Sequence, residues 1–226
     1  MKNFKYILFT LLISTICVSC DWLEPETNET NTIYYSAATL INDSISGKNI
    51  FLTDDNLQLH PTELITIPDA KKDSLLNKRY YISFQVKEQI ENRYSINLLS
   101  SQMMREIEII EIESNEQIAK YKNEILTINR LWTSGTYLNI VSEIKGSGNK
   151  LHNYHLLYNH NITTDTLNLT LRYDHNNDTE DYNLQEATTY NLKNYINTQQ
   201  DSIIIRLDYN SYFPEYSTIY IKTATR

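Results

Sequence analysis

The residue with the clearest chemistry in this chain is Cys20. Lys2 and Lys5 precede an uncharged apolar run from Tyr6 to Val18, and the small residue Ser19 stands directly before the cysteine. This order of a basic region, an apolar region and a cleavage site is typical of an export signal. In bacterial lipoproteins, the cysteine after the cleaved bond becomes the mature N-terminus and carries lipid on its sulfur. We therefore expect lipidation at Cys20.

The apolar run is too short to be a transmembrane helix. It holds 13 residues, whereas crossing a bilayer takes roughly 20, so residues 1–19 are predicted to be a removable signal peptide. Cys17 occupies a place where lipoprotein signals usually have leucine, and the alternative is an ordinary secretory signal followed by a chance cysteine. Cleavage would leave Cys20 as the mature chain's sole cysteine, which excludes internal disulfides and cysteine-based metal sites.

Side-chain oxygens recur at every second position in one acidic stretch, as they do in calcium loops. They belong to Asp174, Asn176, Asp178 and Glu180. An EF-hand also needs glycine at its sixth position and glutamate at its twelfth, where this chain has Thr179 and Gln185. A solvated hairpin loop is therefore the preferred interpretation, with a weak calcium site of another kind as the alternative.

Three histidines, His152, His155 and His160, lie close in sequence. On a strand, His152 and His155 would point to opposite faces, because an odd spacing changes face. This geometry opposes a shared metal, although the fold could bring His160 or His175 near one of the others. We predict no metal site and no cofactor.

Motifs of known catalytic chemistry are missing: the sequence has no GxSxG, HExxH, P-loop or CxxC pattern. Glu106 and Glu108 could form a carboxylate pair, but they alternate with isoleucines, which indicates that they lie on the solvent-exposed face of a strand. The sequence therefore predicts a protein that is not an enzyme. A hydrolase with an unrecognised carboxylate site is the alternative.

Aromatic residues near the C-terminus are the best hint of a binding surface. Tyr212 and Tyr216 flank Pro214 in a cluster with other aromatic residues. Exposed tyrosines can stack on sugars or anchor a protein partner at low entropic cost. We take Tyr212 and Tyr216 as candidate binding residues and expect Tyr209 to pack in the core.

The charge of the chain argues against nucleic acid as a partner. The formal net charge is −8, and removal of a leader holding two lysines and no acidic residue makes it −10. Binding to nucleic acid draws much of its affinity from Lys and Arg at phosphates, so an excess of acidic residues disfavours it.

Most of the chain after the signal shows apolar and polar residues in alternation, which predicts that strands position these residues. One segment, 182–192, is compatible with either helix or strand. In the segment from Met104 to Glu113 the isoleucines change phase between Ile109 and Ile110, which predicts a β-bulge or strong bend. Predicted strands cover 32–41, 49–53, 80–86, 94–98, 126–132, 137–143, 151–159, 167–173, 203–209 and 218–223.

Strands at this spacing indicate a barrel or sandwich. We predict an all-β chain with a flexible tether at 20–30, a small barrel domain at 31–113, a connector at 114–123 and a sandwich domain at 124–226.

Several blocks resemble the NigD-like lipoproteins. They are ILTINRLWTSGTYLNIVSEI at 125–144, KLHNYHLLYN at 150–159, YYISFQVKE at 80–88 and LNLTLRYDHN at 167–176. The resemblance implies an N-terminal OB-like barrel and a C-terminal immunoglobulin-like β-sandwich. The family usually has more glycine in the turn after the tryptophan, where Ser134 and Thr136 flank Gly135 here. Its name comes from a bacteriocin-production locus, and its members have no settled biochemical activity.

Four hydroxyl residues follow aspartate and precede an aliphatic residue, a pattern that resembles the O-glycosylation acceptors of exported proteins in bacteria that carry NigD-like proteins. The candidate acceptors are Ser44, Ser74, Thr166 and Ser202.

These observations predict a lipid-anchored envelope protein, in the outer membrane of a Gram-negative bacterium, that binds a glycan, peptide or protein partner. The alternatives are an envelope hydrolase and a bacteriocin-associated immunity or structural lipoprotein. The leaflet, the partner and the oligomeric state stay open.

Overall fold

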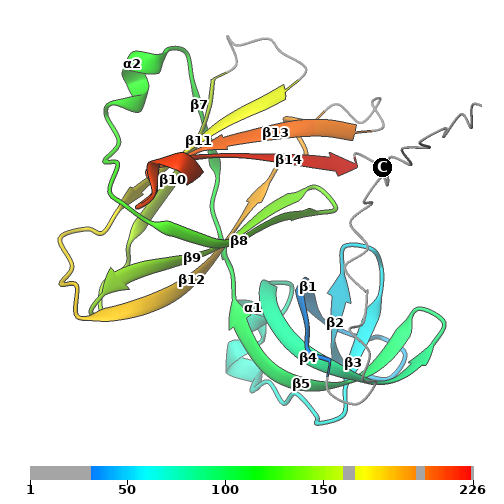
Figure 1. Cartoon of the computed structure of the whole chain (residues 1–226). Coiled ribbons are helices and arrows are strands. Elements are labelled where there is room, and N and C mark those ends of the chain that lie inside the picture. The colour runs from blue at the N-terminus through cyan, green and yellow to red at the C-terminus, as the bar shows by residue number, and fades with distance from the viewer. Residues whose placement is uncertain (1–31, 160–165, 197–201, 225–226) are drawn as a thin grey trace, which may run out of the picture. The chain divides into compact units, whose positions relative to one another are not determined.

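The computed structural model describes residues 32–159, 166–196 and 202–224. Within them the chain forms a closed barrel and then two further sheets, with only short helices (Figure 1). The predicted all-β fold, a small OB-like barrel followed by a β-sandwich, is confirmed. None of the helices in the described segments has the length and apolar character that crossing a membrane requires.

The barrel has five strands in the order β1-β2-β3-β5-β4, and β4 closes back onto β1. Most pairs are antiparallel, but β3 and β5 run parallel, which gives the Greek-key barrel of OB folds. Two short helices, η1 (Asp69–Lys71) and α1 (Lys72–Leu75), connect β3 to β4. The strands are β1 (Tyr34–Asn42), β2 (Asn49–Thr53), β3 (Gln58–Pro61), β4 (Arg79–Ile90) and β5 (Arg93–Met103).

Side chains that point inward alternate with outward ones along the strands, and the inward ones fill the barrel interior. Ile82 and Phe84 of β4 point inward with Ile96 of β5, and all three are buried. Two register shifts between β4 and β5 add the bends that closure of a short barrel requires.

The sandwich consists of a five-stranded sheet, β14-β13-β11-β10-β7, and a four-stranded sheet, β6-β12-β9-β8. The segment 182–192, open between helix and strand in the sequence, forms β12 and pairs along its length with β9. The strands are β6 (Arg105–Glu106), β7 (Ile109–Ile112), β8 (Thr127–Ser134), β9 (Tyr137–Gly146), β10 (Asn153–Asn159), β11 (Thr166–Asp174), β12 (Tyr182–Asn191), β13 (Ser202–Asp208) and β14 (Thr218–Ala224).

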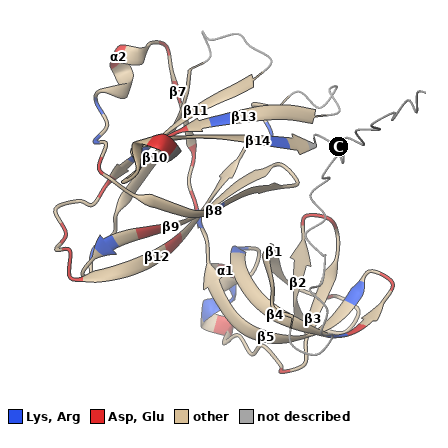
Figure 2. Cartoon of the chain, in the orientation of Figure 1, with Lys and Arg blue, Asp and Glu red and all other residues tan. Residues whose placement is uncertain are grey.

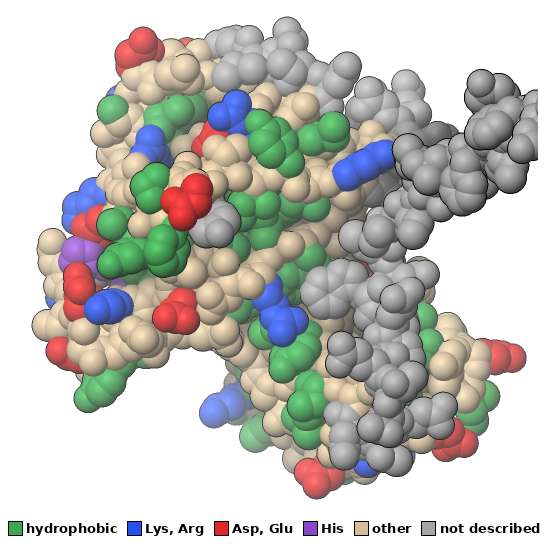
Figure 3. Space-filling model, in the orientation of Figure 1, with side chains coloured by type: hydrophobic (Ala, Val, Ile, Leu, Met, Phe, Trp, Pro, Cys, Tyr) green, Lys and Arg blue, Asp and Glu red, His purple; other side chains and the backbone are tan. Residues whose placement is uncertain are grey.

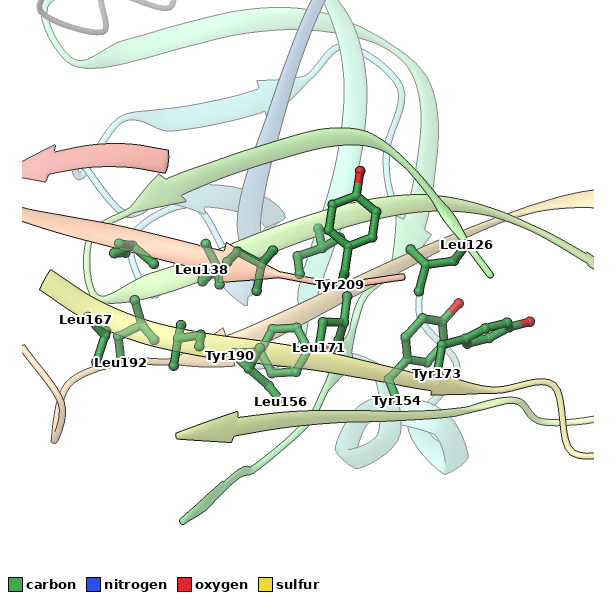
Figure 4. Close-up of a cluster of buried hydrophobic side chains, with 14 of the residues drawn as sticks. Leu126, Leu138, Tyr154, Leu156, Leu167, Leu171, Tyr173, Tyr190, Leu192 and Tyr209 are labelled. Atoms are coloured by element: carbon green, nitrogen blue, oxygen red, sulfur yellow. The ribbon is translucent and has the colours of Figure 1, made fainter. Parts of the chain in front are cut away.

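The inner faces of these two sheets share one apolar core (Figure 4). Leu156 of β10 and Tyr190 of β12 lie in it with no exposed surface. Tyr209, expected to be a core residue, is buried there too.

The boundary between barrel and sandwich differs from the predicted one. The sequence assigned residues through 113 to the barrel, but β6 pairs with β12 and β7 pairs with β10, so both strands belong to the sandwich. The chain crosses from one sheet to the other at residues 107–108, between β6 and β7. The change of phase lies within β7, whose pairing with β10 runs from Ile109 to Ile112 without a register shift, so the bulge predicted at Ile109–Ile110 is not found there. The isoleucines change phase because β7 is covered on both faces, by the core at Ile109 and on the outer side at Ile112. The predicted connector at 114–123 therefore lies within the sandwich, between β7 and β8, and carries the short helix α2 (Asn115–Ile118).

A bulge in β8 turns Trp132 away from the sandwich core. The register with β9 shifts between Ile128 and Arg130, and this shift moves Leu131 onto the core face and Trp132 onto the opposite face. Trp132 contacts Tyr81 of the barrel, with ring centroids 5.7 Å apart. The outer face of the four-stranded sheet thus packs against the barrel.

A buried ion pair fixes the same junction. Arg79 of β4 donates two hydrogen bonds to Asp54, from Nη1 to Oδ1 at 2.8 Å and from Nη2 to Oδ2 at 2.9 Å. Ser134 also donates to Asp54 at 2.5 Å, and Arg79 reaches Asn139 of β9 at 3.3 Å. These side chains join the barrel and sandwich within a single compact unit, Ile33–Arg226.

Candidate functional site

A groove of about 340 Å³ lies beside α2 on the outer face of the five-stranded sheet. Its wall is formed by Ile112 at the end of β7 and by Asn115 and Ile118 of α2. Its floor consists of side chains from three neighbouring strands, β10, β11 and β13. The floor residues are Leu157, Asn159, Asn168, Thr170, Arg206 and Asp208. We call these nine residues the sheet groove.

The two-residue period of the strands places polar side chains on this floor. On β11, Leu167, Leu169 and Leu171 point into the core, so Asn168 and Thr170 must point outward. The strand register then aligns side chains across the sheet. Leu157, Thr170, Asp208 and Thr218 follow one another across the four strands from β10 to β14. Asn168, Arg206 and Tyr220 form the next row.

The charges in the sheet groove are paired with each other. The guanidinium of Arg206 donates to Asp208, from Nε at 3.2 Å and from Nη2 at 3.1 Å. Thr218 Oγ1 also donates to Asp208 at 2.6 Å. On the face shown in Figure 3, blue and red side chains are scattered among tan and green ones and do not form a large patch of one sign. The groove therefore offers hydrogen-bonding groups without a net charge.

His152 occupies a second polar cluster, which is buried at one end of the sandwich. Its Nε2 lies 3.0 Å from Asp178 and its Nδ1 lies 2.6 Å from the hydroxyl of Tyr173. A carboxylate only accepts, so Nε2 carries a proton. Ser147 Oγ donates to Asp178 at 2.6 Å, and both ring nitrogens of His152 are already engaged. This arrangement does not provide the serine with a histidine base.

The pH dependence of stability should report on this cluster. The hydrogen bond from Ser147 Oγ, with further ones from His152 and the backbone of Ser147 and Thr179, holds the pKa of Asp178 well below its usual value despite burial. A lowered pKa contributes stability that is complete above the ordinary carboxyl pKa of about 3.9 and is lost as pH falls through the lowered value. Asp178→Asn should lower the urea midpoint at pH 7 and flatten its decline below about pH 4.

Glu180→Gln is the matched control, because Glu180 is exposed two residues away. If both variants have the same midpoint at pH 7, then Asp178 does not stabilise the fold.

The acidic loop does not gather ligands for calcium. Asp178 turns inward, as described, and Asp174 accepts from Lys122 Nζ at 2.9 Å and from the backbone of Asn176 at 2.7 Å. Within the described ranges, no three His, Cys, Asp or Glu side chains are placed to share a metal ion.

The other histidines are separated as well. His155 lies on the outer face of β10 against Tyr121, with ring centroids 4.8 Å apart, and partial burial lowers its pKa. His175 Nδ1 bonds Glu124. His160 lies outside the described residues.

The candidate binding tyrosines are not part of the sheet groove. Tyr212 is exposed and packs edge-on against Phe213, with ring centroids 5.1 Å apart. Tyr216 belongs to the 3-10 helix η2 (Pro214–Tyr216), which follows Tyr212 and leads into β14. Its side chain is outside what the structure describes.

The candidate modification sites differ in accessibility. Ser44 lies in an exposed turn, and Ser74 is exposed on α1. Thr166 and Ser202 are half-buried at the starts of β11 and β13. Cys20, with the predicted signal and tether, falls outside the described residues, so its lipidation stays a prediction.

Residues 108–223 match the NigD-like C-terminal beta sandwich domain. The chain belongs to the NigD-like family. The match begins between β6 and β7 and runs from β7 into β14, so it covers the strands that carry the sheet groove. No curated protein matches the sequence.

Solved structures share the fold of this NigD-like protein. A protein of unknown function from Bacteroides vulgatus ATCC 8482 has 17% identity and a TM-score of 0.65, with 85% of this chain and 90% of that one covered. A NigD-like immunity protein from Bacteroides caccae ATCC 43185 has 16% identity and a TM-score of 0.59, covering 89% and 100%. A candidate lipoprotein from Bacteroides fragilis NCTC 9343 has 15% identity and a TM-score of 0.55, covering 86% and 99%.

Sequence reasoning missed the sheet groove in this NigD-like protein. A signal for it was present, because the polar residues Asn168 and Thr170 alternate with leucines along one predicted strand. From the sequence alone, this polar face of the strand could not be distinguished from an ordinary solvent-exposed face. The α2 wall, which makes the face concave, comes from a short polar segment without helical periodicity.

Proposed function

We propose that this NigD-like protein is a non-catalytic binding protein, held in the bacterial envelope by lipid on Cys20, whose sheet groove contacts the partner. The observation that carries the proposal is the convergence of hydrogen-bonding side chains from α2, β10, β11 and β13 in one groove. Asp208 is the one carboxylate among the nine lining residues. A glycosidase uses two carboxylates, so the lining supports binding over hydrolysis.

The envelope location is supported by the basic and apolar segments before Ser19 and Cys20. The description of one solved relative as a candidate lipoprotein points the same way. Lys and Arg are interspersed with Asp and Glu over the described strands (Figure 2), which supports a partner other than nucleic acid.

Removal of the acyl acceptor tests the anchoring. Cells producing the unchanged protein should hold it in the membrane fraction, whereas Cys20→Ala should leave that fraction because the lipid attachment point is gone. Density-gradient separation of inner and outer membranes then assigns the membrane. Cys17→Ala is the matched control and should remain membrane-bound. An unchanged Cys20→Ala distribution would refute lipid anchoring at this residue.

A role in bacteriocin immunity is the second candidate function. It is favoured by the name of one solved relative, a NigD-like immunity protein. Deletion of the gene followed by bacteriocin challenge separates the two, since unchanged sensitivity counts against immunity and leaves partner binding standing.

A further inference from the structure

We propose that the sheet groove binds a neutral oligosaccharide, with Tyr220 as a stacking surface beside its polar floor. This inference rests on the proposed binding function and names the chemical class of the ligand.

The hydrogen-bonding groups of the floor match sugar hydroxyls. Thr170 carries a hydroxyl that can donate and accept. Asn159 Nδ2 donates to Asn115 Oδ1 at 3.2 Å and Asn168 Nδ2 donates to the backbone oxygen of Thr166 at 3.0 Å, so the orientation of both amides in the floor is fixed. A sugar hydroxyl also donates and accepts at once. The wall is apolar at Ile118, and an apolar side chain suits the C–H face of a pyranose ring.

The pairing of charges favours a neutral ligand. Arg206 is bonded to Asp208 through two nitrogens, and Asp208 is also bonded to Thr218. An anionic ligand would have to compete with Asp208 for the guanidinium, and a cation would have to compete with Arg206 for the carboxylate. Neither exchange is needed for a ligand that carries hydroxyls alone.

The position of the groove disfavours an extended peptide. Strand addition requires a free sheet edge with unpaired backbone groups. The floor strands β10, β11 and β13 each have a hydrogen-bonded neighbour on both sides, so the floor presents side chains rather than backbone. A ligand recognised there must be read by side-chain amides, hydroxyls and charges.

Tyr220 extends the groove with an aromatic surface. It is the register partner of Arg206, and antiparallel partners have Cβ atoms about 4.5–5.5 Å apart on the same face. Its side chain is 64% exposed, so the ring is accessible to a ligand that lies in the groove. The groove volume lies near the lower end of the roughly 300–1,000 Å³ of small-ligand sites. It therefore fits a short segment of a longer glycan that continues over Tyr220.

Titration calorimetry on the detergent-purified, lipidated protein tests the proposal. The probes are hexasaccharides of glucose, mannose, galactose and xylose, with a sulfated heparin hexasaccharide as the anionic comparison. We expect binding of at least one neutral hexasaccharide. Thr170→Val and Tyr220→Ala should each weaken it about tenfold, while Tyr220→Phe retains it. Lys222→Ala is the control, since Lys222 lies on the same face outside the groove lining.

Two results would overturn the inference. Binding of the heparin probe alone, or of no probe, refutes the neutral class. The site is refuted if Thr170→Val and Tyr220→Ala bind the neutral hexasaccharide as tightly as the unchanged protein does. Circular dichroism must show that both variants are folded. The anchoring part of the proposed function is tested separately, by the Cys20→Ala distribution. Binding at the groove survives failure of the glycan inference if the unchanged protein captures a protein partner and Tyr220→Ala does not.

Discussion

Arg79→Leu should lower the free energy of unfolding by roughly 3–5 kcal/mol, because it leaves a buried carboxylate without its cation. The Arg79 side chain is 5% exposed and that of Asp54 is 14% exposed. Two parallel hydrogen bonds give the pair a bidentate geometry, which restricts both groups more than a single contact would. Leucine cannot replace either bond, and Ser134 would be the remaining side-chain donor to Asp54.

Urea unfolding followed by fluorescence measures this loss. Trp132 lies at the junction of barrel and sandwich, and Trp22→Phe removes the other tryptophan. In this background the emission reports the junction directly.

Lys72→Ala supplies the control for that measurement. Lys72 and Asp69 also form an ion pair, at 2.7 Å, but both side chains are exposed, and exposed pairs contribute little to stability. The Lys72→Ala midpoint should equal that of the unchanged protein. If Arg79→Leu behaves like Lys72→Ala, the ion pair does not hold the two domains together.

The residues at this junction explain why part of the fold was predictable and part was not. Strands such as β11 and β13 follow from local alternation, because one face meets the core and the other meets solvent. The partners of Arg79 are 25, 55 and 60 positions away, and no local pattern links them. Trp132 shows a related limit, since one bulged residue in β8 reverses the face on which every later side chain lies.

The boundary error near Ile109 has the same physical origin. Isoleucines in both phases are expected from a bulge within one sheet. They are also expected where the chain crosses to a second sheet and enters a strand covered on both faces, as β7 is at Ile109 and Ile112. Only the partners of β6 and β7, which are β12 and β10, distinguish these cases. The sheet groove depends on that crossing, because it places Ile112 and α2 beside the outer face of β10.

Leu156→Ala should cost about 2–5 kcal/mol of unfolding free energy, since the lost side chain leaves a cavity that its neighbours fill only in part. Leu156 has no exposed surface and lies at the centre of β10, paired with Leu171 of β11 on one side and Ile109 of β7 on the other. Leu151→Ala is the control, because Leu151 is 64% exposed just before the same strand.

Hydrogen exchange gives the Leu156→Ala experiment a second readout. Leu156 is remote from the barrel core, which contains Ile82 and Ile96. If the junction at Arg79 couples the two domains, faster exchange should reach the barrel amides as well as those of β10. Faster exchange confined to the sandwich would show that the domains unfold independently, and the Arg79→Leu variant should produce that confined pattern in the Leu156→Ala background.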